Sequence, residues 1–142
     1  MDGRGITVEE FMSLSDYLYD SISKRTLEVI KGVEDHMMSE MSISNAAHQL
    51  IDQSHGFIQT ENQELLQAFK EVFSEAQAIV QGQQRISHYE AEVKRAQKVA
   101  DKKAIEENTR YKDMTTSTYL SALQRAVTAV AKAKNVSIGM KL

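Results

Sequence analysis

Apolar residues recur along this chain at the three- and four-residue intervals of amphipathic helices. Thr7 and Glu10 form a capping-box pattern, so the first helix should begin at Val8. One apolar stripe predicts that this helix continues to about Glu40. The stripe consists of Phe11, Leu14, Leu18, Ile22, Val29, Val33 and Met37. The serines and the asparagine of "MSISN" at 41–45 then predict a break, because such residues cap or turn a helix.

A second, shorter helix should follow this break and end near Gly56. Its apolar side consists of Ala47, Leu50, Ile51 and Ser54. Thr60 and Gln63 repeat the capping-box pattern and predict the start of a third helix. Beyond them, six apolar residues recur at intervals of seven, which is typical of a helix that packs against other helices. We call these six residues the seam: Leu65, Val72, Ile79, Ile86, Val93 and Ala100.

The apolar residues that accompany the seam change sides near Gly82, so the two halves of the third helix should face different partners. The β-branched, hydroxyl-rich "DMTTST" at 113–118 predicts the next break. The last helix should end near Asn135 and contain Leu120, Leu123, Val127 and Val130. An unbroken third helix over 61–112 would be about 78 Å long.

These elements predict an all-α fold: an elongated bundle of about four helices, with one long coiled-coil-like helix. The chain has no proline and only six glycines in 142 residues, which favours long helices. We expect a single helical domain over 1–142, with residues 1–6 disordered and residues 136–142 forming a flexible tail.

Composition excludes some kinds of chemistry. Without cysteine, the chain has no disulfide, no thiolate nucleophile and no cysteine zinc site. No stretch is long and apolar enough for a membrane span, and the N-terminal residues lack the apolar core of a secretory signal. We therefore expect a cytoplasmic protein, and secretion by another signal stays open. No Gly-x-Ser-x-Gly or Ser-x-x-Lys pattern marks an activated serine, so no catalytic residue and no cofactor is predicted.

The net charge of −3 conceals a strong division along the chain. Residues 1–84 carry five Lys/Arg against fourteen Asp/Glu, a net charge of −9, whereas residues 85–142 carry twelve against six, a net charge of +6. Such polarity can be satisfied within one bundle, between copies in head-to-tail contact, or by an anionic partner.

Basic residues in the positive half form a ridge that consists of Lys94, Arg95, Lys98, Lys102 and Lys103. A solvated helix face is the favoured interpretation, and a surface for phosphates or for an acidic protein is the alternative. Nucleic acid is possible but not favoured, because acidic residues are mixed in and the sequence pI is about 5.8.

His48, Asp52 and His55 are spaced by four and three residues, which would place them on one helical face. Their nitrogen and oxygen donors suit zinc or iron, so they are weak candidates for metal ligands. The polar edge of the second helix is the favoured interpretation, because the apolar residues of this helix claim its inward side. Neither His36 nor His88 carries an acidic residue three positions before it that would complete a second ligand pair.

Three methionines cluster near the predicted end of the first helix, at Met37, Met38 and Met41. Methionine fills irregular gaps in a core and also forms adaptable binding surfaces. Core packing at a helix end is the favoured interpretation, and a docking patch for a partner helix is the alternative.

The leading functional hypothesis is a non-enzymatic helical interaction protein, such as an adaptor, an assembly factor or an inhibitor-like binder. It would self-associate into a homo-oligomer or dock a protein partner through the seam, with the polarised charges setting orientation. Two alternatives stay open. One is a metal-binding helical-bundle enzyme or carrier that uses His48, Asp52 and His55. The other is nucleic-acid or anionic-surface binding by the basic ridge.

Overall fold

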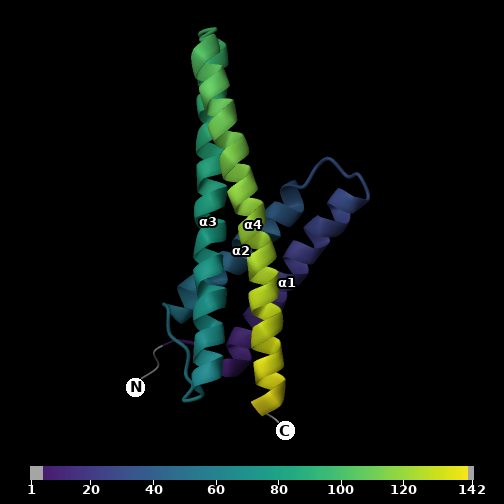
Figure 1. Cartoon of the computed structure of the whole chain (residues 1–142), viewed down its shortest axis with the longest axis vertical. Helices are drawn as coiled ribbons and strands as arrows, with labels where there is room; N and C mark the ends of the chain where they lie inside the picture. The colour runs from purple at the N-terminus through teal and green to yellow at the C-terminus, as the bar shows by residue number, and fades with distance from the viewer. Residues whose placement is uncertain (1–4, 141–142) are drawn as a thin grey trace.

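The computed structural model describes residues 5–140, and in this range the chain forms four helices. They are α1 (Val8–Ile30), α2 (Met37–Ser54), α3 (Gln63–Lys98) and α4 (Lys102–Met140). The helices α3 and α4 form a long antiparallel hairpin, and α1 and α2 pack against its lower half (Figure 1). The prediction of an all-α elongated bundle is confirmed, although two helices are long rather than one.

The first helix begins as predicted but ends ten residues early. The Thr7 hydroxyl accepts a hydrogen bond from the Glu10 amide at 3.1 Å, and the Glu10 carboxylate accepts one from the Thr7 amide at 3.0 Å. The helix stops where Gly32 adopts a φ of +77°. There the Gly32 amide donates to the Val29 carbonyl and the Val33 amide to the Glu28 carbonyl, which is the Schellman end of a helix.

The predicted break at 41–45 is wrong, because these residues lie inside α2. The true break covers 31–36, and Asp35 ends it by accepting a hydrogen bond from the Met37 amide at 2.9 Å. The end of α2 is as predicted: the helix stops at Ser54, and Gly56 lies two residues beyond it at a φ of +84°. A glycine at a positive φ thus follows the end of both α1 and α2, whereas the serines at 41–45 lie at neither end.

The second break is also displaced. The helix α3 ends at Lys98 rather than continuing to 112, because Ala100 takes the left-handed conformation with a φ of +54°. The Ala100 amide donates to the Gln97 carbonyl, and the Asp101 amide donates to the Ala96 carbonyl. The Asp101 carboxylate then accepts a hydrogen bond from the Ala104 amide at 3.1 Å, so one residue closes α3 and caps α4.

Residues 113–118, where a break was predicted, are helical. The Thr116 hydroxyl donates to the Lys112 carbonyl at 2.8 Å, and the Thr118 hydroxyl donates to the Met114 carbonyl at 3.1 Å. Threonine is tolerated inside a helix when its hydroxyl bonds the carbonyl four residues earlier. The helix also continues past Asn135 to Met140.

The chain ends are more ordered than expected over the described residues. Ile6 is buried, and its amide donates to the Phe57 carbonyl at 3.1 Å while its carbonyl accepts from the Gln59 amide at 2.8 Å. Residues 136–140 form the last turn of α4, where Ser137 is buried. The remaining residues of the two expected disordered ends, 1–4 and 141–142, lie outside the described range.

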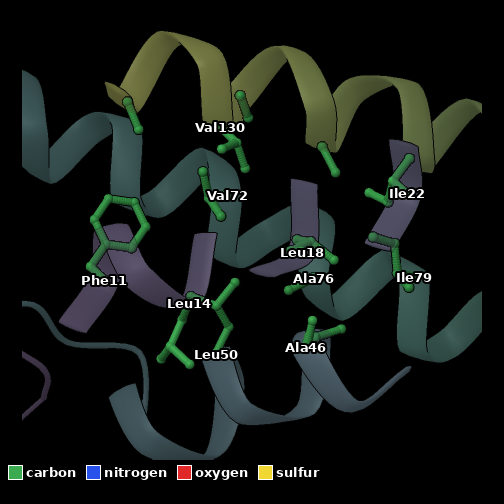
Figure 2. Close-up of a cluster of buried hydrophobic side chains, with 14 of the residues drawn as sticks. Phe11, Leu14, Leu18, Ile22, Ala46, Leu50, Val72, Ala76, Ile79 and Val130 are labelled. Carbon is green, nitrogen blue, oxygen red and sulfur yellow. The ribbon is translucent and has the colours of Figure 1, made fainter. Parts of the chain in front are cut away.

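The core lies only in the lower half of the hairpin, where all four helices meet. Figure 2 shows Phe11, Leu18 and Leu50 of the α1–α2 pair facing Val72 of α3 and Val130 of α4. Above this core, Ala96 is the single buried residue between 80 and 118. We call residues 83–118 the arm and the rest of the described chain the base. The arm extends about 25 Å beyond the core.

Candidate interaction surfaces

The connection between α1 and α2 carries a cluster of exposed apolar side chains. Seven large apolar residues within 27–41 are exposed, and Ile30 and Met38 reach 74% and 75%. We call this cluster the corner: Leu27, Val29, Ile30, Val33, Met37, Met38 and Met41. The other exposed large apolar residues of the described chain lie singly on α1 and in the two later connections, or are spread along α4 between 111 and 140. The corner is therefore the main concentration of exposed apolar surface.

The corner is exposed because the ends of α1 and α2 project away from the hairpin (Figure 1). The stripe predicted for the first helix is buried at Phe11, Leu14, Leu18 and Ile22. Its predicted continuation is exposed, with Val29 near the end of α1, Val33 in the connection and Met37 at the start of α2. Core packing, the favoured interpretation for the three methionines, is wrong, since Met37, Met38 and Met41 are all exposed. A docking patch was the alternative, and exposed methionines suit adaptable contacts.

An open groove separates the corner from the lower part of the arm. Met37 and Met41 of α2 line it on one side, and Ile86 of α3 and Lys112 of α4 line it on the other. Beside the groove, Glu40 ties α2 to the rest of the fold. Its carboxylate accepts hydrogen bonds from the Arg25 guanidinium, the Tyr119 hydroxyl and the Gln83 side-chain amide, so α1, α3 and α4 all converge on it.

This polar cluster joins all four helices through hydrogen bonds to Glu40. Tyr119 is buried, and its hydroxyl donates to Glu40 and accepts from Gln83 at 3.1 Å. Burial raises the pKa of Tyr119 well above its ordinary value, and the neighbouring Glu40 carboxylate raises it further. The hydroxyl therefore stays protonated at physiological pH, and the cluster holds the α1–α2 layer at the point where the arm leaves the core.

The closeness of α3 and α4 at this point depends on Gly82. A Cβ atom on Gly82 would lie 3.0 Å from the Tyr119 ring carbon Cδ1 and 3.2 Å from the Tyr119 Cβ. The residue at which the apolar companions of the seam change sides is thus the place where the hairpin leaves the four-helix core.

The seam is used mainly within the chain. Leu65, Val72 and Ile79 are fully buried in the core, so a partner cannot reach them in this fold. Ile86 and Val93 are half-buried in the arm. Ala100 is exposed and lies beyond the end of α3, in the turn to α4. The even seven-residue spacing therefore does not mark one continuous interface.

The basic ridge predicted along one helix is divided between two helices. Lys94, Arg95 and Lys98 lie in the last turns of α3, while Lys102 and Lys103 open α4. The turn at 99–101 brings both groups to the end of the arm, which we call the tip (94–103). Lower in the arm, Tyr89 packs on Tyr111 with ring centroids 5.6 Å apart, and Lys112 pairs with Glu90 at 3.5 Å.

The candidate metal ligands are not brought together. His48 and Asp52 are exposed on α2, while His55 lies beyond the helix end with a φ of +51° and so leaves the shared face. Within 5–140, no three His, Cys, Asp or Glu side chains are placed to share a metal ion. His36 lies beside Glu28 in the corner, and His88 packs on Tyr89 in the arm.

Over the same residues, no helix combines the length and the apolar character needed to cross a bilayer. Comparisons of the chain with models of protein families, with curated proteins and with solved structures found no match. The surfaces themselves are therefore the basis for a function.

Proposed function

We propose that the chain is a non-enzymatic helical interaction protein that pairs with a second copy of itself through the corner. The observation that carries this proposal is the concentration of seven exposed large apolar side chains within fifteen residues. Among the roles of adaptor, assembly factor and inhibitor-like binder, self-assembly is the one that this surface supports best.

The size of the corner fits a dimer. Seven large apolar residues, each exposed by about two fifths or more, together present several hundred Å² of apolar surface around the α1–α2 connection. Monomers rarely expose more than this, and each partner in a standard interface contributes about 800 Å². Two corners packed on each other would bury an apolar centre with the flanking helix ends as its rim.

The charge of the corner also fits contact with an identical surface. In a two-fold contact each residue faces the same patch on the other copy, so a strongly charged patch would repel itself. Residues 24–41 carry three Lys/Arg and four Asp/Glu, a net charge of −1, although residues 5–64 as a whole carry three against eleven, a net charge of −8. The apolar surface thus lies in the part of an acidic layer where self-repulsion is weakest.

Sedimentation velocity over a range of protein concentrations tests this proposal. The wild type should approach twice the 16.0 kDa chain mass as concentration rises. The double variant Ile30→Asp and Met38→Asp should remain a monomer with unchanged helical circular dichroism, because both side chains are exposed and contribute little to the core.

Ile138→Asp is the matched control, since Ile138 is 52% exposed on α4, far along the chain from the corner. This variant should dimerise like the wild type. A wild type that stays monomeric throughout, or a corner variant that dimerises as well as Ile138→Asp does, would overturn the proposal.

A further inference from the structure

The tip concentrates positive charge that the fold does not neutralise. Residues 94–103 carry five Lys/Arg against one Asp, a net charge of +4. Arg95 pairs with Glu92, but within the described chain no ion pair involves Lys94, Lys98, Lys102 or Lys103. In the base, by contrast, Arg125 pairs with Glu75, Lys132 with Glu71, and Lys134 with Asp16.

Helix stability does not explain the lysines of α4. Lys102 and Lys103 occupy its first turn, which contains no acidic residue. The positive end of the helix dipole lies there and disfavours cations. Only Lys98 and Arg95, in the last turn of α3, have the favourable placement. The cluster is thus assembled at some cost to the local fold.

An apolar side chain stands at the centre of these cations. Val99 is 74% exposed in the turn, and Ala100 beside it is also exposed. Asp101, the third residue of this turn, caps α4 through its carboxylate. Val99 and Ala100 beside it form an apolar apex flanked by lysines, which fits a lipid interface, where an apolar side chain enters the acyl boundary and lysines remain at the headgroup phosphates. A nucleic-acid duplex presents its phosphates along grooves and is usually met by a basic stripe or face rather than by one narrow apex.

The net charge of the whole chain is negative and would repel an anionic surface, but the length of the arm reduces this effect. The Debye length is about 8 Å at physiological ionic strength. The arm holds the tip about 25 Å from the core, so the charge of the acidic base is screened when the tip touches a surface. At longer range, the same separation of charge turns the tip toward an anionic surface and the base away from it.

We propose that the tip binds anionic lipid headgroups, with Val99 inserted at the interface and the lysines on the phosphates. This binding is independent of pairing through the corner. Each Lys or Arg near an anionic leaflet strengthens binding about fivefold. Removing two of the tip lysines should therefore weaken binding about 25-fold.

Co-sedimentation of the full chain with vesicles of phosphatidylserine and phosphatidylcholine tests the proposal. The wild type should bind these vesicles, lose binding as salt rises, and ignore vesicles of phosphatidylcholine alone. The double variant Lys98→Gln and Lys102→Gln should bind about 25-fold more weakly. Val99→Ser should also weaken binding, because it removes the apolar contact and leaves the charge unchanged.

The matched control is Lys24→Gln with Lys70→Gln, which makes the same change in net charge at exposed positions of the base. This control should bind like the wild type. The proposal is overturned by any of three results: no binding to anionic vesicles, an equal loss in the control and the tip variant, or salt-sensitive binding of a DNA or RNA duplex by the tip without vesicle binding.

Discussion

Replacing Gly82 with alanine sets two effects of known size against each other. Alanine in a helix interior is favoured over glycine by about 1 kcal/mol, so helix propensity alone predicts a more stable protein. The new Cβ, however, would lie 3.0 Å from the Tyr119 ring and 3.2 Å from the Tyr119 Cβ. Rotation of the ring cannot relieve the second contact, because that carbon is attached directly to the α4 backbone.

Tyr119 also has little room to move. It is buried, and Glu40 and Gln83 hold its hydroxyl. Overpacking of this kind costs about 1–3 kcal/mol. We therefore expect Gly82→Ala to lower the free energy of unfolding by about 1 kcal/mol after the gain in propensity is subtracted.

Urea unfolding followed by circular dichroism measures this difference, with an unchanged m-value as the test that both proteins unfold alike. Gly139→Ala is the control, because no atom lies within 4 Å of a Cβ added there, and it should leave stability unchanged or slightly raised. If Gly82→Ala is more stable than the wild type, the close contact between α3 and α4 is not a constraint and the reasoning fails.

Five further substitutions test other features by the same unfolding measurement. Burial and Glu40 raise the pKa of Tyr119 above its ordinary 10.0, so the contribution of Tyr119 to the free energy of unfolding is complete below pH 10.0 and is lost as the pH rises above it. The difference in this free energy between the wild type and Tyr119→Phe should therefore shrink by about 2 kcal/mol between about pH 8 and about pH 11.5. A constant difference would contradict this. Gly32→Ala should lower the free energy of unfolding by about 1 kcal/mol because the φ of Gly32 is +77°, whereas Ala100→Gly, at a φ of +54°, should raise it by up to about 1 kcal/mol. Changes of the same sign in both variants would contradict this expectation. Leu18→Ala should lower the free energy of unfolding by about 2–5 kcal/mol because Leu18 is fully buried, and Val99→Ala at the exposed tip should change it by less than about 0.5 kcal/mol. Similar losses in both variants would show that Leu18 does not belong to the core.

The fold class could be predicted from periodicity, but the breaks between helices could not. The capping box at Thr7 and Glu10 and the stripe of the first helix are local signals, and the structure confirms the capping box and the stripe as far as Ile22. Serines at 41–45 and threonines at 113–118 misled because hydroxyls are compatible with a helix when they bond the preceding turn. Gly32 carried the correct signal for the first break.

The turn at Ala100 had no such signal. Alanine is a strong helix former, and it takes a positive φ here because α3 and α4 gain by packing against each other along their whole length. The same non-local effect decides which apolar residues are exposed. Three corner residues, Val29, Val33 and Met37, belong to a predicted stripe that is buried at its start, and only the direction in which the α1–α2 connection leaves the hairpin shows that they are exposed.

The length of the arm can change independently of the packing of the base. The core of the base takes no side chain from residues 87–118, so the arm can be lengthened or shortened without repacking that core. A change of seven residues in α3, matched by seven in α4, preserves the faces that the two helices turn toward each other. Each such matched step alters the distance from the corner to the tip by about 10 Å. The distance between the corner and the tip can therefore change in steps of seven residues per helix, by evolution or by design, while the base stays the same.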